Sequence, residues 1–265
     1  MTRVALLGGG VMGETVLGGL LRGGYAPSDV VVAEKRAERA AELTERHGVD
    51  TATGPDAVRS AEVVLLVVKP QDVASVLAEV ADDLADGVLV VSLAAGVTSA
   101  AIEEALPEGT AVVRVMPNTP ARVGQGMAVA SPGAHATDAQ LELVKEMLGG
   151  TGKVLVVPEK QQDAVTAVSG SGPAYLFLVA EAMTDAAVTL GLPRDVAREL
   201  VTQTLFGSAT LLQESGEHPT LLREQVTSPG GTTAAALAAL EAGGLRTAFA
   251  DALTAARDRS VELGG

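Results

Sequence analysis

A glycine-rich turn close to the start of the chain constrains the fold more than any other feature. Residues 8–13 read GGGVMG, which matches the spacing G-x-G-x-x-G, and they follow an apolar run at residues 4–7. In this setting Gly8 allows a tight turn, Gly10 lets the backbone approach a pyrophosphate, and Gly13 lets helix and strand pack closely. A glycine-rich turn without a ligand is the alternative interpretation. The turn therefore predicts a strand, a helix and a dinucleotide site between them.

The first part of the chain alternates apolar runs with amphipathic stretches. The apolar runs are rich in Val and Leu, as expected for parallel strands that are covered by helices on both faces. This alternation predicts an α/β fold with a doubly wound sheet, which two later runs at residues 127–130 and 154–157 extend. The main predicted strands cover residues 4–7, 30–33, 63–68, 88–93 and 112–116, and the predicted helices cover residues 11–22, 37–46, 73–84 and 98–105.

After Pro158 the pattern changes, because apolar residues recur at helical spacing and the β-branched clusters disappear. We therefore expect a dinucleotide-binding domain over residues 1–158 and a helical domain over residues 159–265. The helix that begins near Pro173 is apolar nearly all round and must be buried on all sides. A small domain of small-residue helices buries it poorly alone, which predicts that a second subunit completes this domain. Helices are expected at residues 163–168, 173–190, 193–214, 220–226, 232–242 and 245–263.

The composition excludes several classes of function. Asp and Glu outnumber Lys and Arg by 33 to 19, and the net charge of -14 argues against nucleic acid as a partner. The absence of Cys excludes a thiolate zinc site and a cysteine nucleophile. No apolar stretch approaches the roughly 18 residues of a membrane span, so we expect a soluble cytoplasmic protein without a membrane partner. His47, His135 and His218 share no metal-like spacing and are expected at the surface, so no metal site is predicted.

Two conflicting signals follow the second predicted strand. Glu34 lies about 20 residues past the glycine turn, where an acidic side chain binds a ribose 2′-hydroxyl and favours NAD. Lys35, Arg36 and Arg39 follow at once and can pair with the 2′-phosphate of NADP. A solvated first turn of the next helix explains these charges as well. Glu34 and Arg36 are the cofactor residues predicted here.

Three later strand ends supply further candidates, since ligands of doubly wound sheets bind beyond the carboxyl ends of the strands. The third strand ends in a lysine and a proline, and the fourth ends in small residues that leave room for a ligand. The fifth is followed by an asparagine between two prolines, whose amide offers both a donor and an acceptor. Ordinary strand-to-helix turns are the alternative. The candidates are Val67, Val68, Lys69, Pro70, Ala95 and Asn118.

A second glycine-rich segment opens a helix in the later part of the chain. Residues 228–233 read SPGGTT and precede an Ala-rich stretch, so their backbone amides converge at a helix N-terminus. Such ends bind carboxylates, which allows an acidic protein to hold an amino-acid-like ligand without a dedicated Arg. A plain helix cap formed by Ser or Thr is the alternative.

These motifs resemble, in their order and spacing, those of the pyrroline-5-carboxylate reductase family. The resemblance spans the chain and includes the runs GGGVMGE, VVKPQ, RVMPNTP, VSGSGPAY, QTLFGSA and VTSPGGTT. It implies a Rossmann-type doubly wound sheet followed by an all-α dimerisation domain. It also implies NAD(P)H-dependent reduction of the cyclic imine 1-pyrroline-5-carboxylate to L-proline, by a homodimer assembled into a larger oligomer such as a decamer.

Matching the motifs residue by residue implies roles for particular positions. The resemblance implies that two backbone segments and Ala95 face the cofactor, with two polar side chains near it. It also implies that the substrate lies against the SPGGTT segment. The implied cofactor residues are Leu7, Gly8, Gly9, Gly10, Val11, Met12, Val67, Val68, Lys69, Pro70, Ala95, Glu159 and Gln225, and the implied substrate residues are Ser228, Gly230, Gly231, Thr232 and Thr233.

The resemblance makes Thr233 the expected catalytic residue, through a hydrogen bond between its hydroxyl and the ring nitrogen. A hydroxyl is enough, because the protonated nitrogen already makes the neighbouring carbon electrophilic and no strong general acid is needed. Glu34 stands where many relatives carry a small polar residue, and Gly54 stands near where some relatives have Asn at the adenosine end. Both departures leave the choice of cofactor open. We expect activity with both NADH and NADPH and a modest preference for NADPH.

Two rival functions are compatible with parts of this pattern. One rival is a β-hydroxyacid dehydrogenase, which has a similar glycine turn. Enzymes that resemble this rival use a Lys on the helix after the Rossmann domain, whereas residues 169–184 of this chain contain no Lys. A non-catalytic dinucleotide sensor would use the helical domain only to dimerise. A sensor would bind the reduced cofactor and leave it reduced in the presence of the imine.

Overall fold

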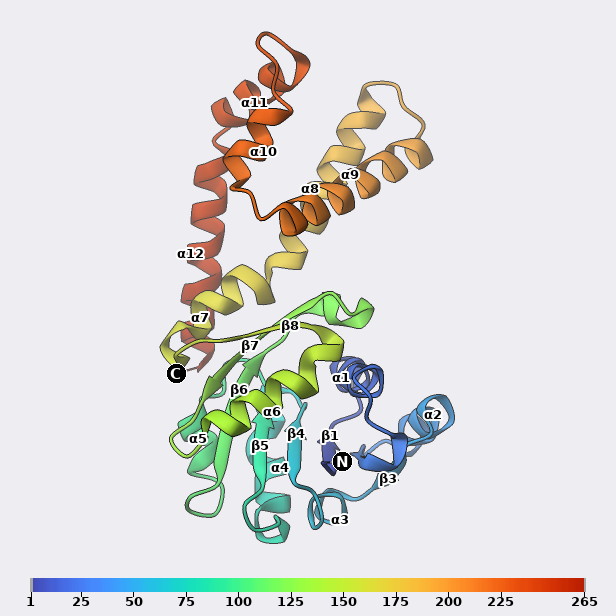
Figure 1. Cartoon of the computed structure of the whole chain (residues 1–265), viewed down its shortest axis with the longest axis vertical. Helices are drawn as coiled ribbons and strands as arrows, with labels where there is room; N and C mark the ends of the chain where they lie inside the picture. The colour runs from blue at the N-terminus through green and yellow to red at the C-terminus, as the bar shows by residue number, and fades with distance from the viewer. Residues whose placement is uncertain (1, 265) are drawn as a thin grey trace. The chain divides into compact units, whose positions relative to one another are not determined.

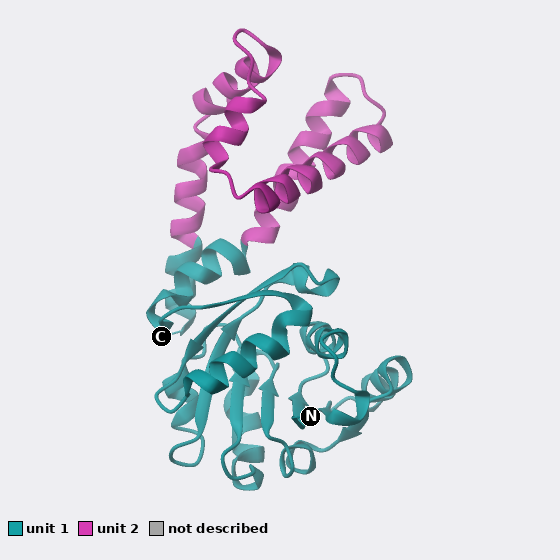
Figure 2. Cartoon of the chain, viewed as in Figure 1, with its two compact units in different colours: residues 1–171, 256–265 teal, residues 172–255 magenta. Residues whose placement is uncertain are grey.

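The computed structural model describes residues 2–264, which form two compact units (Figure 2). The first unit comprises the chain as far as Ser171 and the final segment from Ala256, and the second comprises Gly172–Ala255. The division into domains at residues 158 and 159 stays a prediction. The first unit holds a β-sheet with its helices, whereas the second is entirely helical outside its turns.

The sheet of the first unit has the strand order β3-β2-β1-β4-β5-β6-β7-β8 (Figure 1). Strands β1 to β6 run parallel, β7 is antiparallel to β6, and β8 is parallel to β7. The strand order reverses between β1 and β4, and this is the point at which ligands of such sheets bind. The predicted doubly wound α/β sheet is confirmed. The strands are β1 (Val4–Leu7), β2 (Val30–Ala33), β3 (Asp50–Ala52), β4 (Val63–Leu66), β5 (Leu89–Ser92), β6 (Ala111–Met116), β7 (Gly126–Pro132) and β8 (Gly152–Val156).

Local sequence signals start the helices of this unit. The side chain of Thr53 accepts a hydrogen bond from the Asp56 amide at the start of α3. Thr137 and Gln140 form a capping box at the start of α6. Helix α2 ends at Gly48, whose φ of 72° is the left-handed conformation of a C-cap. The helices are α1 (Val11–Arg22), α2 (Ala37–His47), α3 (Gly54–Val58), α4 (Val73–Val80), α5 (Ser99–Glu103), α6 (Asp138–Leu148) and α7 (Gln162–Val165).

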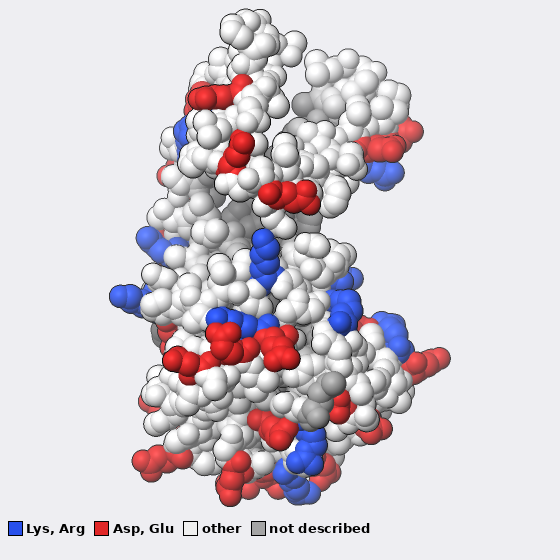
Figure 3. Space-filling view, viewed as in Figure 1, with Lys and Arg blue, Asp and Glu red and all other residues white. Residues whose placement is uncertain are grey.

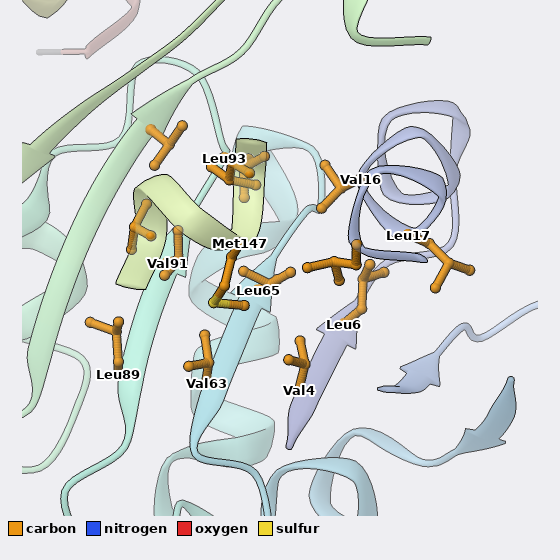
Figure 4. Packing of buried hydrophobic residues seen from close by; sticks show 14 of the residues in the cluster. Val4, Leu6, Val16, Leu17, Val63, Leu65, Leu89, Val91, Leu93 and Met147 are labelled. Carbon is orange, nitrogen blue, oxygen red and sulfur yellow. The ribbon is translucent and has the colours of Figure 1, made fainter. Parts of the chain in front are cut away.

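Both faces of the sheet are packed against helices. Every residue of β1, β4 and β5 is buried, and side chains alternate between the two faces along each strand. Leu6 packs in one cluster with Leu17 of α1 and Met147 of α6 (Figure 4). Leu7 packs in the other cluster, which contains Leu77 of α4. The sheet therefore has a hydrophobic core of its own in the single chain, apart from its edge strand β8, where Leu155 is 56% exposed.

The second unit consists of helices whose apolar side chains are mostly exposed in the single chain. Only Pro173, Ala197 and Val201 are buried among residues 172–255. The main packing within it joins α8 and α9. On the face drawn in Figure 3, the surface of this unit is mainly uncharged. Its helices are α8 (Gly172–Thr189), α9 (Arg194–Ser215), α10 (Pro219–Gln225), α11 (Thr232–Ala242) and the first part of α12 (Leu245–Gly264), whose last residues belong to the first unit.

The structure adds three elements that the sequence pattern did not predict and shortens others. Strand β3 and helices α3 and α6 were missed, and the helix expected over residues 73–84 ends at Val80 and continues as a 3-10 turn at Ala81–Asp83. The helix expected over residues 163–168 is α7 followed by a π-helical turn at Thr166–Gly170. Strand β3 alternates too little to be recognised, because only Ala52 of its three residues is apolar.

Candidate cofactor and substrate sites

The glycine turn has the geometry that a bound pyrophosphate requires. Gly8 has a φ of 108°, and a Cβ atom there would lie 2.6 Å from the Val67 carbonyl oxygen. A Cβ atom on Gly13 would lie 1.9 Å from the Gly8 carbonyl oxygen, so no larger residue fits between α1 and the turn. A Cβ atom on Gly10 would meet no heavy atom within 4 Å. Two glycines thus allow close packing and the third leaves open space where a ligand can approach the backbone.

The N-terminus of α1 carries no side-chain cap. Gly10 is the N-cap residue, and no side chain accepts a hydrogen bond from the first amides of the helix. The amides of Val11 and Met12 therefore remain available to an anion at the positive end of the helix. The structure fits a dinucleotide at this position, since it supplies both the free donors and the space.

A cleft of about 1010 Å³ opens at the carboxyl ends of β1, β2 and β4. It lies at the reversal of strand order, as the fold predicts. The structure brings many of the predicted cofactor residues together in this cleft, and their function as cofactor contacts stays a prediction. The predicted cofactor residues that line the cleft are Leu7, Gly8, Gly10, Glu34, Arg36, Val67, Val68 and Lys69.

Sequence reasoning missed several residues that line this cleft. Thr51 and Ala52 of β3, Thr53 before α3, and Val76 and Glu79 of α4 contribute to it. These residues carry no motif, and the short polar strand β3 gave no signal that would have found them.

Glu34 is fixed at the rim of the glycine turn. Its side chain is 8% exposed, and its Oε2 atom accepts a hydrogen bond of 3.1 Å from the Gly9 amide. Its Oε1 atom accepts hydrogen bonds of 3.0 Å from both the amide and the Nε atom of Arg36. Burial opposes ionisation, but the hydrogen bonds from Arg36 and Gly9 outweigh it and hold the pKa of Glu34 below its ordinary value. Glu34 is therefore a charged acceptor at neutral pH.

Arg39 belongs to an ionic cluster behind the turn. Its Nε atom donates a 2.9 Å hydrogen bond to the Gly9 carbonyl oxygen, and its guanidinium pairs with Glu14 and Glu42. Arg46 and His47 also bind Glu14. Burial raises the pKa of Glu14, but the hydrogen bonds from Arg39, His47 and Arg46 outweigh it and lower that pKa to about 2. This cluster ties α1 and α2 to the glycine turn.

The expectation that all three histidines lie at the surface is wrong for His47. Its side chain is only 17% exposed, because Glu14 binds its Nε2 atom at 3.0 Å. His135 and His218 are exposed, as predicted. Within residues 2–264, no group of three or more His, Asp or Glu side chains is arranged to hold a metal ion.

The remaining predicted cofactor residues of the first unit lie outside the cleft lining. Pro70 begins a 3-10 turn at Pro70–Asp72, and Ala95 is exposed after β5. Asn118 donates to the Ser169 carbonyl oxygen at 3.0 Å and accepts from the Met127 amide at 2.8 Å. Its amide therefore already holds two backbone segments together.

Glu159 is bound within the first unit by groups that sequence reasoning did not single out. It accepts a 2.8 Å hydrogen bond from the Ser99 amide and another from the Ser99 hydroxyl at the start of α5. Its Oε1 atom also lies 3.2 Å from the guanidinium of Arg114, whose side chain is 7% exposed. The one basic residue inside the apolar run of β6 was the signal for this ion pair.

The predicted substrate segment lies in the second unit at the start of α11. Gly230 has a φ of 68°, and the Gly231 amide donates a 3.0 Å hydrogen bond to the Ser228 carbonyl oxygen. Helix α11 begins at Thr232, with Gly231 as an N-cap residue that makes no side-chain capping hydrogen bond. The alternative of a plain Ser or Thr cap is therefore wrong, and the first amides of α11 remain available. Thr233 is half-buried in the first turn.

Gln225, predicted near the cofactor, ends α10 in the same unit. Its side chain is exposed and donates a 2.7 Å hydrogen bond to Glu217.

None of the helices in the described part of the chain is both long and apolar enough to span a bilayer.

Family models match both parts of the chain. Residues 159–263 match the model described as pyrroline-5-carboxylate reductase dimerisation. Residues 3–96 match the model described as NADP oxidoreductase coenzyme F420-dependent.

Individual proteins resemble the chain over its full length. A pyrroline-5-carboxylate reductase of Corynebacterium melassecola is 46% identical over 268 residues, which cover 100% of this chain and 99% of that relative. The solved pyrroline-5-carboxylate reductase of Coxiella burnetii has a TM-score of 0.95 and 38% identity, with 100% of this chain and 99% of the other covered. Plasmodium falciparum pyrroline carboxylate reductase, solved with NADP bound, has a TM-score of 0.88 and 27% identity, with 100% and 98% covered.

Proposed function

The chain belongs to the pyrroline-5-carboxylate reductase family, and from this premise we propose how its residues divide the work of catalysis. Its activity is the NAD(P)H-dependent reduction of the cyclic imine 1-pyrroline-5-carboxylate to L-proline. The observation that carries the assignment of roles is the pair of uncapped, glycine-opened helix N-termini at α1 and α11. Each offers backbone amides to an anionic group in a protein whose net charge is -14.

The turn before α1 holds the cofactor. The amides of Val11 and Met12 donate hydrogen bonds to the pyrophosphate, which lies at the open face of Gly10. The adenosine end lies in the cleft beyond β1, β2 and β4. NAD(P)H supplies the hydride when it is bound. Lys69, Pro70, Ala95 and Asn118 follow strands nearer the middle of the sheet and are assigned to the nicotinamide end, together with Glu159 and Gln225.

The turn before α11 holds the substrate. Its amides bind the substrate carboxylate, and the positive Φ of Gly230 shapes a turn in which Ser228, Gly231 and Thr232 contribute backbone contacts. The Thr233 hydroxyl orients the ring nitrogen and stabilises its changing charge. The substrate nitrogen is protonated and its neighbouring carbon is already electrophilic, so this reaction needs positioning more than a strong acid.

The chain forms a homodimer through its matched dimerisation region. The proposal adds that dimers assemble into a larger oligomer such as a decamer and that the protein acts in the cytoplasm. It also keeps residues 1–158 as the cofactor domain and residues 159–265 as the dimerisation and substrate domain.

Turnover of the imine by Thr233 variants tests these roles. We expect Thr233→Ala to lower kcat about 10- to 100-fold, because the hydroxyl acts mainly by positioning. Thr233→Ser keeps the hydroxyl and should retain most of the activity. The measurement is the loss of NADH or NADPH absorbance with 1-pyrroline-5-carboxylate, and full turnover by Thr233→Ala with normal binding would refute the role.

A further inference from the structure

We propose that Glu34 makes the cofactor cleft selective for a ribose with a free 2′-hydroxyl, and hence for NADH over NADPH. The inference rests on the proposed cofactor role of the cleft. Of the two conflicting predictions from the residues after β2, it favours NAD recognition by Glu34 over NADP recognition by the basic residues.

The first observation is the fixed position of the Glu34 carboxylate. It lines the cleft at the end of β2, and its hydrogen bonds from the Gly9 and Arg36 amides prevent it from swinging away. In doubly wound sheets this is the place where a side chain meets the 2′-position of the ribose. A carboxylate accepts a hydrogen bond from a hydroxyl but repels a phosphate dianion.

The second observation is that the neighbouring cations are already paired. Lys35 lies 2.9 Å from Glu79, which lines the cleft as well. Arg36 binds Glu34 itself, so its transfer to a phosphate would leave that carboxylate unpaired beside the new negative charge.

The side chain of Arg39 binds acceptors outside the cleft lining. Three acceptors hold it, namely the Gly9 carbonyl oxygen, Glu14 and Glu42, and it does not line the cleft. One of the three basic residues predicted to pair with a 2′-phosphate is thus part of the scaffold behind the glycine turn.

Lys69 does not substitute for these residues. It lines the cleft, but it follows β4, and β1 separates β4 from β2 in the sheet. Its position is on the other side of the glycine turn from Glu34, away from the place where the fold recognises the 2′-position.

Nucleotide binding in the absence of the imine tests the proposal. Isothermal titration of the full-length wild-type protein should give a Kd for NADH at least about tenfold lower than for NADPH, because of the charge repulsion at Glu34. Glu34→Gln should reduce that ratio about tenfold or more, mainly by strengthening NADPH binding. The variant keeps an amide oxygen for the Gly9 amide, and thermal unfolding of the free protein checks that it folds.

Glu38→Gln is the matched control. It removes the same charge from an exposed position on α2 that does not line the cleft, and it should leave the ratio unchanged. The proposal is overturned if the wild type binds NADPH as tightly as NADH or more tightly, which is the modest preference expected from the sequence. It is also overturned if Glu34→Gln leaves the ratio of the two Kd values unchanged. Selective NADH binding without turnover of the imine would count against the proposed function alone. Failure of both nucleotides to bind would overturn the cofactor role and this inference together.

Discussion

The two compact units contain apolar residues in similar abundance but use them differently. In the sheet unit, β1, β4 and β5 are buried along their whole length. In the helical unit, Leu176, Phe177 and Leu178 of α8 are 58%, 68% and 65% exposed in the single chain. A helix with consecutive apolar residues at such exposure cannot be stable against water by itself. The difference shows that one unit has a core of its own, whereas the other contributes half of a core.

This difference ties the stability of the helical unit to association. Burial of apolar surface stabilises a fold by about 25 cal/mol per Å², and the helical unit gains most of this only when a second copy covers it. Its stability should therefore depend on protein concentration, while that of the sheet core should not. The dimerisation model that matches residues 159–263 covers the helices concerned.

The largest expected effect comes from a charge placed on the uncovered face of α8. Phe177→Asp should prevent dimer formation, because an unpaired carboxylate would have to be buried in the new core. We expect monomers in sedimentation velocity experiments, since unpaired buried charges cost several kcal/mol. With the loss of the dimer, the activity should fall at least about 100-fold.

Phe177→Leu is the control, because it keeps an apolar side chain at the same place. It should remain dimeric and active. Dimers of Phe177→Asp with the sedimentation behaviour of the wild type would show that this face of α8 lies outside the interface.

A core deletion in β1 gives the converse test of the comparison. Leu6 is 0% exposed, so Leu6→Ala should lower the free energy of unfolding by about 2–5 kcal/mol through a cavity. The dimer should persist, and the shift of the denaturant midpoint should be the same at every protein concentration. Leu178→Ala removes the same atoms from α8, and its effect should change as the protein is diluted. Equal concentration dependence in both variants would contradict the division into a complete and an incomplete core.

The fold was largely readable from sequence wherever one residue pattern decided the outcome. Runs of Val and Leu located β1, β2 and β4, since a strand buried on both faces needs no alternation. Helix α6 was missed although Thr137 and Gln140 form a capping box ahead of apolar residues at helical spacing. That signal was present in the sequence, whereas β3 offered none.

The site was less readable, because its charges pair across long stretches of the chain. The sequence placed Glu34 and Arg39 near the cofactor but did not indicate that Arg39 turns towards Glu14, 25 residues earlier. Nor did it join Arg114 to Glu159, which are 45 residues apart. A local pattern names the groups that carry charge, and only the packing of α1, α2 and the sheet decides which of them meet.

The smallest expected effect concerns the ionic cluster around Glu14. It compares the contribution of these ion pairs to the stability of the sheet unit with that of the core. Glu14→Gln should lower the free energy of unfolding by about 1–2 kcal/mol at pH 7, because the amide oxygen still accepts hydrogen bonds and Arg46 is largely solvated. The pKa of Glu14 is lowered to about 2 in the fold, so its contribution is complete above its ordinary value of 4.5. It is lost as the pH falls through that window, where the carboxylate becomes protonated.

Denaturant unfolding of wild type and Glu14→Gln at a series of pH values should therefore give curves that differ at pH 7 and converge towards pH 2. Glu45→Gln, an exposed change on α2, which carries the partners of Glu14, should stay within about 0.5 kcal/mol of the wild type throughout. A difference for Glu14→Gln that stays constant down to pH 2 would mean that the side chain acts by packing and not by charge. A difference as large as that of Leu6→Ala would show that the glycine turn is held by its ion pairs as strongly as the sheet is held by its core.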